Sequence, residues 1–525
     1  MFQSAPGGLD AMIRAKLEPA IALHRQGKLA QAKVIYQDIL RADPRQADAL
    51  HLLGIIAGQS GNFPLAAELL GKAVEIDPGN AAFHCNLGNA QKELGQLPAA
   101  IASYEKALAI SPQYAEAWCN RGNALLGLRR FDAAIANYDR ALSIRPDLAQ
   151  AHSNRGYALQ ELNRFDAALA GYDRAIAIKP DYAEAYTNRG YVKQRMQRLD
   201  AAIADYDRAI DIDADDAEAH WNKSLALLVG GNFEQGLPLY EWRWRRRHLR
   251  VREFTQPLWL GAESLQGKTI LLHSEQGLGD TIQFCRYAGL VAGLGARVIM
   301  EVPRPLLVLL QGLEGVSQWM GQGTPLPAFD FHCPLLSLPL AFKTTIDSIP
   351  GSAAYLRSDA AKVDAWAARL GPKTARRVGI IWSGSAGHQN DIQRSLALSE
   401  LIARLPPHCQ YLSLQKDLRD ADAATLRLHP QVHHFGEELA DFTDTAALCE
   451  LMDVVISVDT GVAHLAAALG KPTWILLPSH PDWRWLLNRD DSPWYPSARL
   501  YRQGTAGDWS GVLEKVGADL RSLPA

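Results

Sequence analysis

Apolar and small residues in the first half of the chain recur at a fixed step of 34 positions. Each period holds a glycine, an alanine, a phenylalanine or leucine and, in most periods, a tyrosine. Each closes on a proline, at Pro44, Pro78, Pro112, Pro146 and Pro180. Proline cannot continue a helix, and glycine admits a close neighbour. The pattern therefore predicts pairs of antiparallel helices that approach most closely at the glycine.

A repeat of this length is the tetratricopeptide pattern, whose helical pairs stack into an α-solenoid. We expect about seven units over residues 10–247, the first and last of them degenerate caps. The arm is similar to that of O-linked N-acetylglucosamine transferase.

One polar residue per unit recurs at the same step along the first helix of each pair. These residues are Asn86, Asn120, Asn154, Asn188 and Asn222. Because an amide donates and accepts together, such a ladder suits an acceptor peptide lying along the concave face. The alternative is that each asparagine hydrogen-bonds a neighbouring helix. Arg121, Arg155 and Arg189 follow three of the asparagines and add positive charge, either for acidic partners or as a solvated face.

The second half changes to alternating strand and helix patterns, which are typical of parallel sheets covered by helices. We expect a junction at residues 248–267, an N-terminal α/β lobe at 268–372 and a C-terminal nucleotide-sugar-binding lobe at 373–525. The predicted strands are 269–273, 296–302, 329–333, 377–382, 410–414, 454–458 and 473–477. Two lobes of this kind enclose a cleft, with ligands at the carboxyl ends of the strands. In the basic, aromatic run before this half, Trp242 and Trp244 are expected to pack at an interdomain seam.

Two motifs follow predicted strands. The first is Gln276-Gly-Leu-Gly-Asp-Thr281, and the second is Asp459-Thr-Gly-x-x-His464-Leu-x-Ala-Ala-x-Gly-x-Pro. The second motif opens a short helix, whose free N–H groups and dipole suit a phosphate. The alternative is an ordinary crossover in which Asp459 only caps the helix.

Together the motifs resemble the ADP-heptose:lipopolysaccharide heptosyltransferases, which have the GT-B glycosyltransferase fold. The resemblance runs from about Leu258 to the C-terminus. It implies that Asp280 is the general base that takes a proton from the acceptor hydroxyl. The alternative is that Asp280 merely caps its helix. By the same resemblance, the donor is held by Gly277, Gly279, Asp459, Thr460, Gly461 and His464.

Further donor contacts are expected from the loops that follow other strands of the second lobe. Arg394 can bind a leaving diphosphate bidentately, with Ser383, His388 and Asp391 in the same loop. Gln415 and Lys416 follow the next strand, and Trp483 and Trp485 offer rings for sugar stacking or simply pack in a loop. GT-B enzymes typically need no metal, and the sequence shows no metal-ligand spacing, so no cofactor is expected.

Composition narrows the class of protein further. A net charge of −3 gives no strong attraction to nucleic acid. The basic run at residues 240–252 is too short to indicate nucleic-acid binding by itself. The six cysteines form no Cys-x-x-Cys pair. Neither a signal peptide nor a membrane-spanning run is visible, so a cytoplasmic location is expected. The sequence leaves open whether the chain forms oligomers.

These patterns predict an inverting glycosyltransferase that moves a sugar from a nucleotide-sugar donor to a hydroxyl, with a protein acceptor held by the repeat arm. Transfer to a lipopolysaccharide or another glycan is the alternative within enzymes. A non-catalytic tetratricopeptide scaffold with a degenerate transferase half is the alternative from another class.

Overall fold

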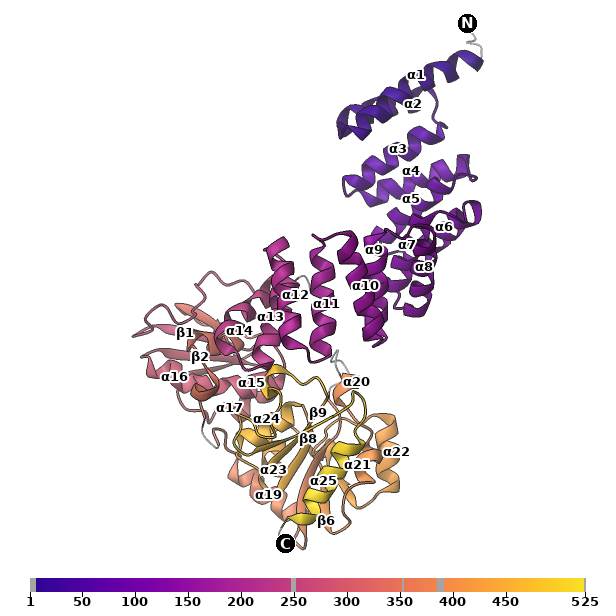
Figure 1. Cartoon of the computed structure of the whole chain (residues 1–525). Coiled ribbons are helices and arrows are strands. Elements are labelled where there is room, and N and C mark those ends of the chain that lie inside the picture. The colour runs from indigo at the N-terminus through magenta and orange to yellow at the C-terminus, as the bar shows by residue number, and fades with distance from the viewer. Residues whose placement is uncertain (1–5, 247–251, 352–353, 385–390, 524–525) are drawn as a thin grey trace. The chain divides into compact units, whose positions relative to one another are not determined.

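The computed structural model describes residues 6–246, 252–351, 354–384 and 391–523. The chain divides into two compact units, Met1–Asp215 and Asp216–Ala525. The first unit is built from paired helices, as predicted (Figure 1). Its helices are α1 (Pro6–Arg25), α2 (Leu29–Ala42), α3 (Ala47–Gln59), α4 (Phe63–Ile76), α5 (Ala81–Glu93), α6 (Leu97–Ile110), α7 (Ala115–Gly127), α8 (Phe131–Ile144), α9 (Ala149–Glu161), α10 (Phe165–Ile178), α11 (Ala183–Arg195) and α12 (Leu199–Ile212).

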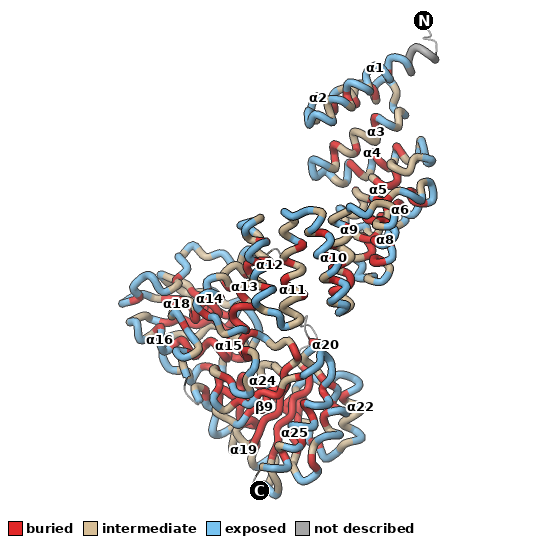
Figure 2. The backbone as a smooth tube through the Cα atoms, in the orientation of Figure 1, coloured by how far each residue is buried: buried red, intermediate tan, exposed pale blue. Residues whose placement is uncertain are grey.

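In four repeats a glycine of the first helix packs against a tyrosine of the second helix. A Cβ on Gly122 would lie 2.7 Å from the ring of Tyr138, so only glycine permits this approach. Gly88 and Gly190 meet their tyrosines in the same way. The tyrosine rings are fully buried, and Figure 2 shows the buried positions following the inner faces of the helices.

A second periodic contact fixes the turn between repeats. A ring side chain on the first helix lies close to the carbonyl of the proline six residues earlier. Trp118 Nε1 donates to the Pro112 carbonyl at 3.0 Å, and His152 Nε2 lies 3.0 Å from that of Pro146. The proline thus ends one helix and offers the oxygen that anchors the next.

The second unit begins with a further helical hairpin, formed by α13 (Ala217–Val229), α14 (Phe233–Tyr240) and the 3₁₀ turn η1 (Glu241–Arg245). We call residues 217–245 the repeat-derived hairpin. Trp242 stacks on His220 with ring centroids 3.7 Å apart, and Trp244 Nε1 donates to Glu241. By its contacts this hairpin belongs to the α/β half, which therefore begins before the region of family resemblance near Leu258.

Two parallel sheets make up the α/β half. Sheet A has the order β3-β2-β1-β4, and sheet B has the order β10-β9-β8-β5-β6-β7. The strands are β1 (Thr269–His273), β2 (Arg297–Val302), β3 (Gln318–Gly321), β4 (Phe331–Pro334), β5 (Arg376–Ile381), β6 (Cys409–Ser413), β7 (Val432–His434), β8 (Val454–Val458), β9 (Thr473–Leu477) and β10 (Ala498–Arg502). The fold is thus an α-solenoid followed by a two-lobed α/β unit of the GT-B type.

Helices flank both sheets. They are α15 (Leu278–Phe284), α16 (Ala288–Gly293), α17 (Leu307–Leu310), α18 (Leu338–Ala341), α19 (Ala360–Leu370), α20 (Asp391–Arg394), α21 (Leu398–Ile402), α22 (Asp420–Leu428), α23 (Phe442–Glu450), α24 (Gly461–Ala468) and α25 (Ser510–Ser522). Short 3₁₀ turns η4 (Leu335–Ser337) and η7 (Trp483–Trp485) follow β4 and β9. The helical stretch after β1 is not continuous, because the 3₁₀ turn η2 (Cys285–Tyr287) separates α15 from α16.

Strand order reverses at one place in each sheet. In sheet A the reversal lies between β1 and β4, and in sheet B it lies between β5 and β8. Loops leave in opposite directions at such a point, which opens the crevice where α/β sheets bind ligands. The two motifs follow β1 and β8, and the loop that leads to Arg394 follows β5, so all three strands border a reversal.

Candidate active site

At the reversal in sheet B, the loops after β5 and β8 meet. Arg394, at the end of α20, donates to the backbone carbonyl of Asp459 at 3.1 Å. Its Nε is buried without a hydrogen-bond partner among the described residues. Helix α24 starts two residues after Asp459, so a guanidinium and a helix N-terminus face the same crevice. This pairing suits an anionic ligand.

A network of ring and carboxyl groups holds the start of α24. The carboxylate of Asp459 lies 3.6 Å from His464 Nε2, and the Nδ1 of the same ring lies 2.9 Å from the Tyr495 hydroxyl. Burial would raise the pKa of Asp459, but His464 and the charge of Arg484 hold it below its ordinary value. Asp459 is therefore ionised at neutral pH and fixes the orientation of His464.

The first-lobe motif forms the start of α15. Asp280 Oδ2 accepts from the Gly277 backbone N–H at 2.8 Å, which is the helix-capping contact weighed as the alternative to catalysis. Its other oxygen accepts from Arg484, a residue of η7. The carboxyl side chain is 18% exposed, and a carboxylate has about four acceptor positions, so these contacts leave it able to accept from a substrate hydroxyl.

The two motifs touch each other. A Cβ built on Gly279 would lie 2.6 Å from His464 Cδ2 and 3.5 Å from the Gly461 Cα. Because Gly279 has no side chain, the loop that carries Asp280 lies against the first turn of α24. The structure thus brings the predicted base and the predicted anion site to one place.

The other residues predicted to contact the donor lie in the loops after β5 and β8, and several of them make contacts within the protein. Asp391 is buried, pairs with Arg419 and accepts from Ser395 Oγ at 2.8 Å, so its carboxylate holds the loop after β5. Ser383 is also buried. Thr460 is the N-cap residue of α24, and its hydroxyl lies 3.2 Å from Ser457 Oγ. His388 lies outside the described residues.

Gln415 and Lys416 follow β6, the neighbour of β5. The Gln415 side-chain oxygen is buried without a partner among the residues described, and Lys416 Nζ donates to the Ala440 carbonyl at 3.3 Å. Both groups lie one strand away from the reversal in sheet B, and a donor contact from either one stays a prediction.

The two tryptophans predicted to stack on a sugar are packed in the protein. Trp483 is 4% exposed and contacts the rings of Phe233 and Tyr240, while Trp485 is 0% exposed and lies against His464. Neither ring has an open face, so the packing favours the alternative of a packed loop.

The asparagine ladder is engaged within the helices at several positions. Asn120 Nδ2 donates to Asn89 at 3.0 Å, and Asn154 Nδ2 donates to Asn123 at 2.8 Å. Asn86 Nδ2 lies 2.7 Å from a ring nitrogen of His51. The contacts of Asn120 and Asn154 each use one N–H of the amide, whereas the Asn86 oxygen also accepts from Asn89 Nδ2 at 3.4 Å. Asn188 and Asn222 show no hydrogen-bond partner for their side chains among the described residues. Arg121, Arg155 and Arg189 pair with Glu105, Asp139 and Asp173.

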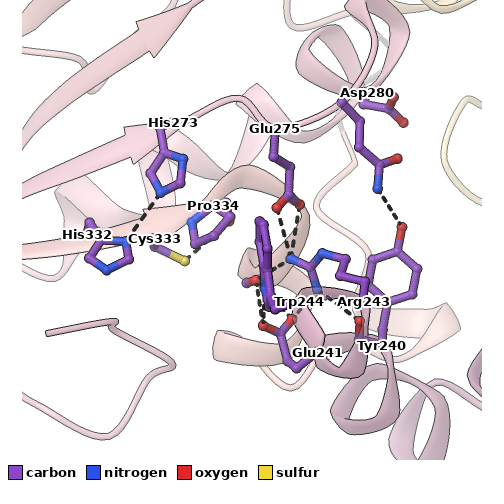
Figure 3. Close-up of polar contacts among 12 residues, drawn as sticks. Tyr240, Glu241, Arg243, Trp244, His273, Glu275, Asp280, His332, Cys333 and Pro334 are labelled. Atoms are coloured by element: carbon purple, nitrogen blue, oxygen red, sulfur yellow. Dashed lines mark hydrogen bonds and ion pairs between the residues drawn. The ribbon is translucent and has the colours of Figure 1, made fainter. Parts of the chain in front are cut away.

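Sequence reasoning missed two charged groups beside Asp280. Arg484 lies 204 positions along the chain from Asp280 and pairs with both Asp280 and Asp482. Glu275, five residues before Asp280, is held by Arg243 of the repeat-derived hairpin, as Figure 3 shows. The sequence carried one local signal for these contacts. Arg243, the partner of Glu275, and Arg484 each lie between two tryptophans, in Trp242-Arg-Trp244 and Trp483-Arg-Trp485.

Two histidines at the reversal in sheet A face each other. His273 Nε2 lies 3.2 Å from His332 Nδ1 (Figure 3). Burial lowers the pKa of His273 to about 3, so its ring is neutral.

Within the described residues, no cluster of three or more His, Cys, Asp or Glu side chains could hold a metal ion. In the same part of the chain, no helix is long and apolar enough to cross a membrane.

Comparison with known proteins agrees with both halves. Residues 436–499 match glycosyltransferase family 9 (heptosyltransferase). Residues 56–95, 88–128, 160–197 and 195–228 match the TPR repeat, and residues 115–148 match the tetratricopeptide repeat. The chain therefore combines tetratricopeptide repeats with a glycosyltransferase family 9 domain. The matched part of that domain runs from η6 (Gly436–Glu438) into β10 and contains the second motif.

Protein FlbA of Caulobacter vibrioides is 26% identical to this chain over 343 residues. The match spans 58% of this chain and 55% of FlbA, so it covers about half of that relative. Among solved structures, MamA is 25% identical and covers 32% of this chain and 97% of its own, with a TM-score of 0.29. The thermophilic TPR protein TTC0263 of Thermus thermophilus is 23% identical and covers 35% and 99%, with a TM-score of 0.31. The repeat assignment rests on the period and helices of this chain itself.

Proposed function

We propose that this protein is an inverting glycosyltransferase that uses a nucleotide-sugar donor. The observation that carries the proposal is the contact of Gly279 with His464 and Gly461. It brings a carboxylate from one lobe beside a helix N-terminus and a guanidinium from the other. Glycosyl transfer requires this combination, a base for the acceptor and positive groups for the leaving diphosphate.

In the proposed reaction, the acceptor hydroxyl loses its proton to Asp280 as its oxygen attacks the anomeric carbon. The bond from that carbon to the diphosphate oxygen breaks, and the nucleoside diphosphate leaves with the electron pair. Direct displacement inverts the anomeric centre. Arg394 and the N–H groups at the start of α24 stabilise the charge that develops on the diphosphate. Asp459 and His464 orient that helix end.

No metal enters this proposal, because the positive groups come from the protein itself. Arg394 reaches the start of α24 through its contact with the Asp459 carbonyl, and Arg484 lies close enough to influence both Asp280 and Asp459. The guanidinium of Arg394 and the helix dipole can carry the charge for which other transferases use a divalent ion.

We propose a protein as the acceptor. The repeat arm supplies a long helical surface, and such arrays bind extended segments along their concave face. The amide oxygens of Asn120 and Asn154 are left for peptide N–H groups, since each residue's own contact uses only an amide hydrogen. A cytoplasmic setting fits the free, mostly buried cysteines.

The test is an assay of turnover with a panel of nucleotide sugars in the presence of EDTA. Turnover is measured as release of the nucleoside diphosphate. We expect one donor to turn over and Asp280→Asn to lower kcat by 100-fold or more, on the order of the effect of a general base. Asp482→Asn, which alters the neighbouring carboxylate on Arg484, is the matched control and retains most of the activity. A chain that turns over no donor, or an Asp280→Asn variant with unchanged kcat, would sink the proposal.

A further inference from the structure

A side chain from the repeat-derived hairpin lies at the reversal in sheet A. Arg243, from the repeat-derived hairpin, donates from Nη2 to Glu275 at 3.0 Å and to Ser337 Oγ at 2.7 Å. Glu275 follows β1, and Ser337 lies in η4 directly after β4. These are the two strands between which the order reverses. The guanidinium therefore bridges the two loops at the place where an open sheet would take a ligand.

The contacts of Arg243 are buried and use most of its donors. Its Nη1 donates to Glu241 at 2.6 Å and to the Tyr240 carbonyl at 3.1 Å. The side chain of Arg243 is 1% exposed and that of Glu275 is 7% exposed. Figure 3 shows the guanidinium lying between the two glutamates. A buried charge tolerates little movement, because any displacement leaves it without a partner in a medium of low dielectric constant.

The bridge fixes the loop that carries the proposed base. Glu275 begins the segment 275–280, and Asp280 ends it. The start is held by Arg243, and the end is held by the Gly277 N–H and Arg484. The segment is thus anchored at both ends by arginines, one from the hairpin and one from the second lobe.

The hairpin also departs from the pattern of the repeats that precede it. In four of those repeats the tyrosine hydroxyl donates to a side chain of the same repeat, as Tyr104 does to Asn89 and Tyr172 does to Gln160. Tyr240 holds the equivalent position, yet its hydroxyl accepts from Gln276 at 3.4 Å. Its ring packs on Trp483, next to Arg484. In the last repeat, the tyrosine at this position, Tyr240, therefore contacts the loop that carries Asp280.

We propose that Arg243 is a positioning residue of the active site, through which the last repeat holds the segment from Glu275 to Asp280 in place. The role of Asp280 as a base rests on the proposed function. The fixing of residues 275–280 by Arg243 does not depend on it. The repeat-derived hairpin is then a structural part of the transferase.

The decisive experiment is amide hydrogen exchange on the full chain, because it needs no substrate. In Arg243→Met we expect exchange of residues 274–281 to quicken by at least about tenfold, as local opening no longer breaks the buried pair. Arg243→Lys keeps the charge and restores part of the protection. Arg246→Gln removes the half-exposed pair with Glu218 on the same segment and leaves residues 274–281 unchanged. If Arg243→Met does not fold, Glu275→Gln replaces it, since the amide keeps the volume of the carboxyl group.

Kinetics with the donor found above separates positioning from overall stability. We expect Arg243→Met to lower kcat on the order of 100-fold with the donor KM within threefold, because the proposed charged contacts to the diphosphate, Arg394 and the start of α24, lie in the second lobe. In a protein that already carries Glu275→Gln, Arg243→Met should lower kcat little further. Unchanged exchange at residues 274–281 in both Arg243→Met and Glu275→Gln overturns the inference. An enzyme without turnover overturns the proposed function only, and the exchange result still decides the role of Arg243.

Discussion

Gly279 shows how a single missing side chain brings two halves of a site together. Its Cα lies against the ring of His464, and that ring is fixed on one side by Asp459 and on the other by Tyr495. The ring cannot move aside without breaking one of these contacts. The glycine is therefore needed for space, and its φ is not in the left-handed region that favours glycine.

Gly279→Ala is expected to destabilise the second unit by about 1–3 kcal/mol, the usual cost of forcing an extra carbon into a packed site. It should also lower nucleotide affinity, since His464 supports the first turn of α24. Gly293→Ala is the matched control, because no atom lies within 4 Å of its added Cβ. Thermal unfolding and calorimetry measure both effects, and equal behaviour of the two variants would contradict the packing argument.

Glu275 predicts a pH dependence of stability. Burial raises its pKa to about 7, although Arg243 opposes the rise. A carboxyl whose folded-state pKa is raised stabilises the fold fully below its unfolded pKa, and this stabilisation is lost as pH rises through the folded value. Relative to Glu275→Gln, the wild type should therefore lose stability as the pH rises through about 7. Denaturant unfolding at several pH values measures this loss, and parallel curves for the two proteins would refute it.

At the scale of elements, the periodic and apolar patterns predicted much of the fold. The strands predicted at 269–273, 454–458 and 473–477 are confirmed at both ends. Three strands were missed: β3 and β7 are only four and three residues long, and β10, Ala-Arg-Leu-Tyr-Arg, carries two charges at an edge of sheet B. Short and edge strands carry too few buried positions to show in a pattern.

The candidate site was predicted only in part, for a physical reason. A loop after a strand and a helix N-terminus can be recognised locally, so Asp280, Arg394 and Asp459 could be named as candidates from the sequence. The pairing of Asp280 with Arg484 and the bridge from Arg243 to Glu275 depend on how distant elements pack. Packing also decides that Trp483 and Trp485 are buried, which no spacing in the sequence indicates.

The asparagine ladder gives a prediction at this scale. Asn120→Ala removes the hydrogen bond to Asn89 and should cost about 1 kcal/mol of arm stability. Asn188→Ala should change stability by less than about 0.5 kcal/mol, because no such contact is described for it. Denaturation followed by circular dichroism compares the two. A larger loss from Asn188→Ala would show that the ladder's contacts have been assigned wrongly.

At the scale of the whole molecule, the α/β half includes the last helical hairpin of the repeat series. Phe233 packs on Trp483 and Trp494, and Arg243 neutralises Glu275. A chain of residues 216–525 should therefore fold. A chain of residues 258–525, which starts where the family resemblance starts, should aggregate, because it leaves a buried carboxylate unpaired and two tryptophans uncovered. Size-exclusion chromatography with near-UV circular dichroism distinguishes them, and a folded 258–525 chain would refute this boundary.

The most direct test of the central claim is calorimetric titration of the full chain with UDP, GDP, ADP and CMP in the presence of EDTA. We expect saturable binding of one nucleotide, which Arg394→Gln weakens at least tenfold, as loss of a charged phosphate contact should. Arg419→Gln, which removes the arginine that pairs with Asp391, is the control and keeps most of the affinity. Binding of none of the four nucleotides, or binding that Arg394→Gln leaves unchanged, would contradict the transferase account.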